Sequence, residues 1–494
     1  MEHYNEAHKF LRKINSDTTL NLEAEINKLK SISGKRYSDV LDKDGNQYVD
    51  LVQQGGGVWG VALVGYVYVL EQVGIRFFSL AGTSAGAINA LAMASIAGKK
   101  RTKTEPILEA LLALEMKSLI DGKKEDTIFT TWERKLISKL LKFPFYKKFI
   151  LNFMQWLFCL CISFTIASMT SLLFFLPNEG RMLHFITIGI WVVTFILAYI
   201  TYDRLSVLTR DGFGLNDGDV FHEWVKKALL EKQQVKNLDD LKTNFNQLPD
   251  DLYLDTTASH RTITEEKPQT PRLTIIANDV TTNNKIEFPK MWDLYFDATK
   301  EVHPADFVRA SMSIPIFFET FTLDTKPNNI NAWNTHLNWG TANQNCIPDK
   351  VFFVDGGSLS NFPINIFYNP NYSVPRMPTL GIRLIDKKIA KIENCKSILE
   401  FGGNIIQSMK LSSDKEFLNK NQSYNMGIGY VEIGETLSWL NFYMNEAEKE
   451  ELFKIGAKAA LDFLRTFDWD DYKNKRKAEQ MHMVNTKLFN PNNW

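Results

Sequence analysis

The chain has 494 residues, which is enough for one large α/β domain with additions or for two or three smaller domains. Lys plus Arg equals Asp plus Glu, 57 each, so no net field favours nucleic acid, and we expect no nucleic-acid partner. The four cysteines show neither zinc-site spacing nor a disulfide framework. We therefore expect no metal and no cofactor.

The first 45 residues are polar and have a mainly helical pattern, which predicts an N-terminal helical extension. They lack the apolar core of a secretory signal. The segment Asp42–Asn46 resembles a calcium loop only superficially, because its glycine comes two positions too early for an EF-hand. A tight Asp-Gly turn between strands is the better interpretation.

From residue 46 to 130 the pattern alternates between strands and helices. Tyr48–Gln54 predicts a strand that runs into three glycines, and Val61–Val73 predicts an apolar helix closed by a glycine. Arg76–Ala81 predicts a second strand, and Ala85–Ala97 a second helix. This order is typical of an α/β fold with a mainly parallel central sheet and helices on both faces.

Two long apolar runs interrupt this pattern within residues 131–210. Residues 149–176 contain no Asp, Glu, Lys or Arg, and neither do residues 182–202. Each run is long enough to cross a bilayer core of ~30 Å as a helix. Basic residues flank both runs. By the positive-inside rule we predict a transmembrane hairpin in a multi-pass membrane protein, with the lipid bilayer as a partner and the soluble part facing the cytoplasm.

The soluble pattern resumes after the second run. Residues 211–467 contain the strand Val351–Val354 and a clear amphipathic helix at Asn445–Thr466. Residues 468–494 are rich in charge and are interpreted as a C-terminal tail.

Ser84 is the candidate nucleophile, in the segment Gly82-Thr83-Ser84-Ala85-Gly86. A nucleophilic serine must stand clear of the backbone on a sharp strand-to-helix turn, and small residues two before and two after it permit that turn. Here Gly82 and Gly86 hold those places in the nucleophile elbow. The start of the following helix also favours negative charge developing near Ser84.

A glycine-rich loop, Gly55-Gly56-Gly57, follows the first predicted strand. Consecutive glycines can present backbone N–H groups to an anion. The loop lacks the Lys-Ser/Thr of a P-loop, and no acidic ribose partner follows as in a dinucleotide site. Beside a nucleophile elbow, an oxyanion hole formed by Gly55, Gly56 and Gly57 is the better role.

Asp355 ends the apolar strand Val351–Val354 and is followed by two glycines. A carboxylate there is costly to bury unless it is used or paired. Because active sites of parallel sheets lie at the carboxyl ends of strands, we expect Asp355 to meet Ser84 and to accept its proton.

These three motifs, in this order, resemble the patatin-like phospholipase family, over roughly residues 46–466 outside the apolar hairpin and a loop at 324–350. Further segments agree: Asp217-Gly218-Asp219, Ala277-Asn278-Asp279, and Val308-Arg309-Ala310-Ser311 with Pro315. The resemblance implies a patatin-like three-layer sandwich. It also implies hydrolysis of fatty-acyl esters of membrane lipids by a Ser84–Asp355 dyad through an acyl-enzyme. This chain departs from the family's pattern at Gln54, where an acidic residue is usual, and at Trp59, where Arg or Lys is usual.

Other functions stay open at this stage. A Ser-Asp-His esterase needs a late histidine, and the chain offers only His482, in the charged tail. A lipid acyltransferase would share the dyad, and a catalytically silent membrane scaffold would need neither residue. A phospholipase fixed in the host's own membrane would be dangerous, which favours control by a regulatory ligand, a partner or self-assembly.

Overall fold

The computed structural model describes residues 4–18, 20–32, 35–120, 162–163, 165–166, 185–196, 199, 212–255, 270–326, 329–339, 346–369, 374–386, 414–434 and 437–489. The chain divides into two compact units. The first unit comprises residues 1–120, 218–315 and 320–494, and the second comprises residues 121–217 and 316–319. Every site discussed below lies in the first unit.

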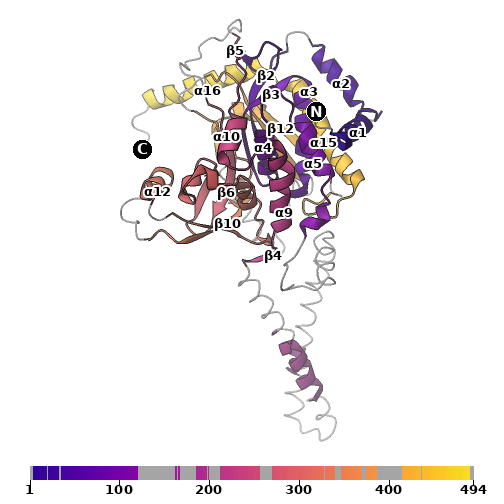
Figure 1. Cartoon of the computed structure of the whole chain (residues 1–494), viewed down its shortest axis with the longest axis vertical. Coiled ribbons are helices and arrows are strands. Elements are labelled where there is room, and N and C mark those ends of the chain that lie inside the picture. Colours follow the sequence, from indigo (N-terminus) through magenta and orange to yellow (C-terminus); the bar gives the residue numbers. More distant parts are fainter. Residues whose placement is uncertain are drawn as a thin grey trace. The chain divides into compact units, whose positions relative to one another are not determined.

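The first unit is built on a ten-stranded mixed sheet with the order β12-β11-β2-β3-β6-β10-β9 (Figure 1). Off this path, β1 pairs with β2 and β5, and β7 pairs with β6. The strands from β12 to β6 are parallel, whereas β10 is antiparallel to β6 and to β9. The expectation of a mainly parallel sheet therefore holds for only one half of it. Its strands are β1 (Val40–Leu41), β2 (Gln47–Gln53), β3 (Ile75–Thr83), β5 (Tyr253–Leu254), β6 (Leu273–Asp279), β7 (Asn284–Phe288), β9 (Phe321–Asp324), β10 (Lys350–Asp355), β11 (Thr379–Asp386) and β12 (Ile428–Ile433).

Helices pack onto this sheet. α15 lies along α3 and against β12, α4 packs on β2, β3 and β6, and α11 packs on β6 and β10. The helices are α1 (Asn5–Asn15), α2 (Leu22–Lys30), α3 (Gly60–Gln72), α4 (Ala85–Ser95), α5 (Thr104–Leu112), α9 (Asp219–Trp224), α10 (Leu238–Phe245), α11 (Ala305–Ser311), α12 (Ile330–Leu337), α14 (Ser423–Met426), α15 (Glu446–Thr466) and α16 (Trp469–Phe489). Shorter 3-10 helices are η1 (Gly57–Trp59), η2 (Met116–Leu119), η4 (Glu231–Gln233), η5 (Trp292–Leu294), η6 (Thr299–Glu301) and η8 (Gly356–Ser358), and a π-helix, η3 (Val225–Leu230), continues α9.

Local sequence explains the elements that carry the site. β2 and β3 are buried along nearly their whole length, as expected for central strands covered on both faces. α3 is apolar around its whole circumference and is buried from Val61 to Glu71. α15 begins with a capping box, in which Asn445 and Glu448 each accept a hydrogen bond from the other's backbone N–H. Sheet and helices thereby form a rigid frame.

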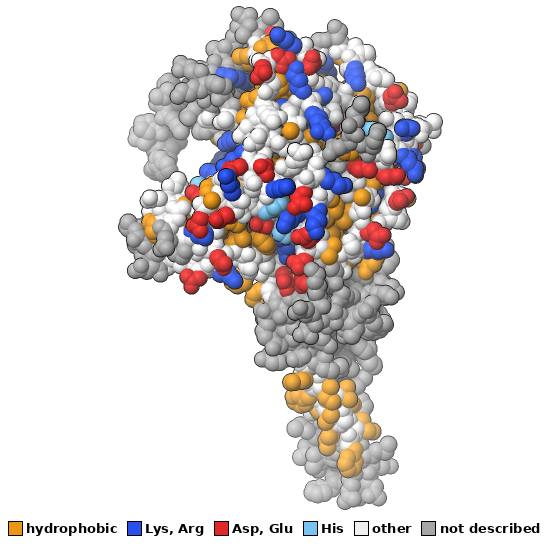
Figure 2. Space-filling view, in the orientation of Figure 1, with side chains coloured by type: hydrophobic (Ala, Val, Ile, Leu, Met, Phe, Trp, Pro, Cys, Tyr) orange, Lys and Arg blue, Asp and Glu red, His pale blue; other side chains and the backbone are white. Residues whose placement is uncertain are grey.

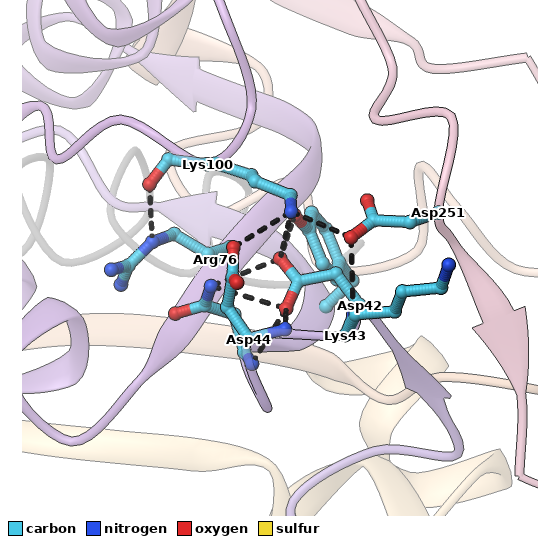
Figure 3. A network of polar contacts seen from close by, with 8 residues as sticks. Asp42, Lys43, Asp44, Arg76, Lys100 and Asp251 are labelled. Atoms are coloured by element: carbon cyan, nitrogen blue, oxygen red, sulfur yellow. Dashed lines mark hydrogen bonds and ion pairs between the residues drawn. The ribbon is translucent and has the colours of Figure 1, made fainter.

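The segment Asp42–Asn46 forms a turn between β1 and β2, with Gly45 at φ +81°. The ammonium of Lys100 lies among the carboxylates of Asp42, Asp44 and Asp251 (Figure 3). Its Nζ lies 2.7 Å from carboxylate oxygens of both Asp44 and Asp251. Asp42 accepts hydrogen bonds from the backbone N–H groups of Asp44 and Asn46. This acidic cluster therefore stabilises a turn.

The predicted transmembrane hairpin is not found. No helix in the described part of the chain is long and apolar enough to span a membrane. Residues 185–196, which are helical, belong to the second apolar run. Most other residues of the two apolar runs lie outside the described residues. The prediction of a multi-pass membrane protein with its soluble part facing the cytoplasm is therefore wrong.

The exposed surface differs between the described parts of the two units. The helix at 185–196 exposes large apolar side chains, including Phe185, Ile188 and Phe195 (Figure 2). On the face of the first unit shown there, both signs of charge are interspersed. In the second unit, β4 (Gly214–Asn216) pairs in parallel with β8 (Ile316–Phe318).

The C-terminal segment from residue 468 contains the long helix α16. Trp469, Tyr472, Lys473 and Arg476 on its first two turns are buried. The Lys473 ammonium lies 3.0 Å from the carboxylate of Asp39, which also accepts a hydrogen bond from the Trp469 indole N–H. The start of this segment is therefore part of the folded unit, despite its charge.

Candidate active site

Ser84 stands at the junction of β3 and α4 with φ +54° and ψ −122°. This backbone conformation is strained for a residue with a side chain and is typical of a nucleophile elbow. A Cβ at Gly82 would overlap the carbonyl of Gly86, and a Cβ at Gly86 would overlap the carbonyl of Gln53 on β2. The two glycines therefore let the elbow close against its neighbouring strand.

The surroundings of Ser84 fix both its backbone and its hydroxyl. The Ser84 N–H donates to Ser311 Oγ at 2.9 Å, and Ser311 Oγ in turn donates to the Ile276 carbonyl at 2.6 Å. The Ser84 hydroxyl donates to Met312 Sδ at 3.1 Å. Ser84 is only 4% exposed.

The glycine loop lies directly beside the elbow, since a Cβ at Gly55 would come within 2.9 Å of Ser84 Cβ. The Gly55 N–H donates to the Asn361 carbonyl at 3.1 Å. Among the described residues, the N–H groups of Gly56 and Gly57 have no acceptor. They are thus the two donors of this loop left for an anion.

Both departures from the family's pattern have a structural role. The Trp59 indole N–H donates to the Leu437 carbonyl at 3.1 Å, and Gln54 Oε1 accepts from the Leu384 N–H at 2.8 Å. Next to Trp59, the Val58 N–H donates to the Trp439 carbonyl at 3.0 Å. Uncharged side chains here anchor the glycine loop to the segment before α15 and to β11.

Asp355 reaches the site through the register of β6. The β6 residues 275–279 pair with β7, and the same strand pairs with β3 at residues 273–276 and with β10 at residues 277–279. A strand has only two edges, so β3 and β10 share one edge and run toward each other. Thr83 lies opposite Ile276, and Asp355 lies opposite Ala277, one position or ~3.4 Å further along the strand.

The structure therefore brings Asp355 next to the elbow, although by a different route from the one the sequence suggested. β10 is antiparallel, so Asp355 and Ser84 do not share a common carboxyl edge; the ends of two strands meet instead. Asp355 is 8% exposed and accepts a hydrogen bond from the Gly357 N–H at 2.6 Å. Its own N–H donates to the Ser313 carbonyl at 2.8 Å.

Several residues that position the two candidates escaped sequence reasoning. Asn361 joins the Asp355 loop to the glycine loop, because its Nδ2 donates to the Gly55 carbonyl at 3.2 Å. Asp414 accepts from Ser360 Oγ at 3.1 Å and from the Phe362 N–H at 3.2 Å, and burial raises its pKa to about 6. The only local feature that could have pointed to these residues is Asn361 itself, six positions after Asp355 and just before Phe-Pro.

The segment Arg309-Ala310-Ser311 supports the candidate site through hydrogen bonds. Arg309 is buried, and its Nη1 donates to Ser313 Oγ at 2.7 Å. A Cβ at Gly218 would come within 2.8 Å of the Arg309 guanidinium. Asp279 accepts hydrogen bonds from the N–H groups of Thr281 and Thr282 and so caps the turn after β6. These residues shape the frame around Asp355.

An apolar cavity opens beside the elbow. It begins at Gly57, Ala85 and Met312 and continues between α3, α4, α5 and α9, where its walls include Val61, Ile88, Ile107, Leu111, Phe221 and Trp224. Asn89 is the one amide side chain among the residues that line it. Cavities with such linings accept hydrocarbon groups.

The chain is similar to several known proteins. The chain is 24% identical over 424 residues to the uncharacterized protein YqhO of Bacillus subtilis (strain 168), which covers 85% of this chain and all of that protein. It is also similar to the crystal structure of VipD from Legionella pneumophila, with a TM-score of 0.33, 12% identity, and coverage of 89% of this chain and 73% of that one. Residues 51–368 match the patatin-like phospholipase family, and this range is well over half of the chain. The chain therefore belongs to the patatin-like phospholipase family.

Proposed function

We propose that this protein is a lipid acyl hydrolase of the phospholipase A or lysophospholipase type, with Ser84 as the nucleophile and Asp355 as the proton acceptor. The observation that carries the proposal is the strained Ser84 elbow, which stands between the glycine loop and an apolar cavity. An ordinary strand-to-helix turn would need neither a glycine loop nor an apolar cavity beside it.

In the first half-reaction, Ser84 Oγ attacks the acyl carbonyl carbon of the lipid ester while Asp355 takes the hydroxyl proton. The carbonyl oxygen becomes an oxyanion, for which the N–H groups of Gly56 and Gly57 are the available donors. One such donor contributes about 10²–10³ in rate. The C–O bond then breaks, the leaving alcohol takes the proton from Asp355, and the acyl group remains on Ser84.

In the second half-reaction, water attacks the acyl-enzyme and gives its proton to Asp355. The fatty acid leaves, and the proton returns to Ser84. The apolar cavity favours this role because it offers the acyl chain a place next to the nucleophile. Burying each methylene there contributes ~0.8 kcal/mol.

The test is mass spectrometry of the products released from defined glycerophospholipids and lysophospholipids. Wild type should release free fatty acid. Ser84→Ala and Asp355→Asn should each lower the rate by at least about 10³-fold, because the nucleophile and its base act as one unit. Ser31→Ala removes an exposed hydroxyl far from the site and serves as the matched control.

Two further outcomes are informative. His482→Ala should retain full activity, and a loss as large as that of Ser84→Ala would favour a Ser-Asp-His esterase. Full activity of folded Asp355→Asn would exclude the dyad. Transfer of the acyl group to an added lysolipid instead of water would identify an acyltransferase.

A further inference from the structure

A second, larger cavity lies behind the apolar one. It is bounded by α1, by the turn after α5, and by the segment 442–446 with the start of α15. Its volume is about 760 Å³, against about 60 Å³ for the cavity beside Ser84. Its walls mix apolar side chains such as Phe10 and Met444 with charged ones such as Lys13 and Glu450.

Three residues line both cavities: Leu114, Met116 and Phe442. A side chain that faces two cavities is the partition between them. Each of the three is at most 7% exposed. A hydrocarbon chain that extends from Ser84 into the apolar cavity therefore meets this partition where the two cavities adjoin.

We propose that Leu114, Met116 and Phe442 set the length of acyl chain that the site accepts. The inference rests on the proposed function, since it takes an acyl ester of Ser84 as the occupant of the apolar cavity. A chain that fits in front of the partition packs against the apolar lining of the cavity. A longer chain must displace one of the three side chains before it can enter the larger cavity.

The partition is fixed from both sides, which makes it a wall and not a loose contact. Lys449 on α15 donates its ammonium to the carbonyls of Leu111, at 3.2 Å, and Leu114, at 3.0 Å. This anchors the turn after α5. On the other side, Phe442 follows the segment whose Leu437 and Trp439 carbonyls accept from Trp59 and Val58. The same segment thus supports the glycine loop and one side of the partition.

The experiment compares hydrolysis of p-nitrophenyl esters with 4, 8, 12 and 16 carbons. Phe442→Ala removes the largest side chain of the partition and joins the two cavities. Each additional buried methylene favours binding by about fourfold. We expect the ratio of kcat/KM for the 16-carbon ester to that for the 8-carbon ester to rise at least about tenfold over wild type.

Met444→Ala is the matched control, because Met444 lines only the larger cavity. Its chain-length profile should match that of wild type. If Phe442→Ala does not fold, Phe442→Leu is the second variant and should show a smaller shift in the same direction. An unchanged profile in a folded Phe442 variant overturns the proposal.

A binding measurement separates this inference from the proposed function. If wild type hydrolyses no 4-carbon ester in a Ser84-dependent way, the proposed function fails. Binding of fluorescent fatty acids with 8 and 16 carbons still tests the partition in that case. Phe442→Ala should bind the 16-carbon probe at least about tenfold more tightly than wild type, with a smaller change for the 8-carbon probe. Equal affinities would overturn the inference by themselves.

Discussion

The Ser84 elbow and the Asp355 loop hold the two candidate catalytic residues by different means. The elbow is closed by its own glycines and by the adjacent strand β2. The Asp355 loop depends on partners that are distant in the sequence: Ser313, Gly55, which Asn361 of the loop contacts, and Asp414. A change in the elbow should therefore disrupt the fold locally and strongly, whereas changes around the loop should reduce activity or stability in smaller steps.

The largest effect is expected from Gly86→Ala. The added Cβ would overlap the Gln53 carbonyl, which belongs to backbone that cannot move without disturbing the sheet. We expect a loss of ~3–5 kcal/mol in the free energy of unfolding, together with loss of ester hydrolysis. Chemical denaturation and an esterase assay measure the two effects.

Gly74→Ala is the control for this experiment. Gly74 has φ +88°, but a Cβ there would meet nothing within 4 Å, so only the backbone strain of ~1–2 kcal/mol remains. If Gly86→Ala and Gly74→Ala lower the free energy of unfolding by the same amount, then overlap with the Gln53 carbonyl is not the reason that position 86 requires glycine.

An intermediate effect is expected from Asn361→Ala. It removes the link from the Asp355 loop to the Gly55 carbonyl but leaves the apolar cavity intact. Misplacement of the glycine loop should lower kcat by about 10-fold to 100-fold, with KM nearly unchanged. Steady-state kinetics on a soluble ester separate the two constants.

Asn365→Ala lies in the same segment at an exposed position and is the matched control. It should leave both constants at their wild-type values. An equal rise in KM and fall in kcat for Asn361→Ala, or no change in either, would show that Asn361 does not position the glycine loop.

The smallest effect concerns pH and Asp414. Burial raises the pKa of Asp414 to about 6 from the ordinary 3.8, so the native state binds its proton more tightly than the unfolded state. Stability from this group is therefore present at low pH and is lost as pH rises through 6, by up to ~3 kcal/mol. Asp414→Asn should flatten the unfolding free energy between pH 4 and pH 7.

Denaturant titrations at several pH values measure this slope. Asp50, whose pKa burial also raises to about 6, should keep its own contribution in the variant. An identical pH dependence in wild type and Asp414→Asn would mean that folding does not raise the pKa of Asp414.

Sequence reasoning identified the elbow because its determinants are local. Gly82 and Gly86 flank Ser84, β3 is a buried strand, and α4 is built of small apolar residues. Each of these features can be read within about 20 residues. The glycine loop after β2 could be predicted for the same reason. The hydrogen bond from the Gly55 N–H to the Asn361 carbonyl, about 300 residues away in the chain, could not.

Features that depend on long-range pairing were not predictable. The strand before Asp355 has the same composition whether it runs parallel or antiparallel, so its direction emerged only from its pairing with β6. The hairpin was predicted from hydropathy alone, which measures the length of an apolar run; no helix in the described part of the chain is long and apolar enough to span a membrane. The segment from residue 468 was interpreted as a tail because its buried Lys473 and Arg476 look like surface charge.

The hydrogen bonds from Val58 and Trp59 to Trp439 and Leu437 have a consequence for how the protein can be divided. The region that matches the family ends at residue 368, and it contains Ser84, Asp355 and all three loop glycines. A fragment trimmed to that region would keep every residue of the proposed chemistry. It would lose the backbone carbonyls that hold the oxyanion loop in place, together with β11 and β12. A fragment made to test the proposed chemistry should therefore extend well beyond the borders of the sequence signature.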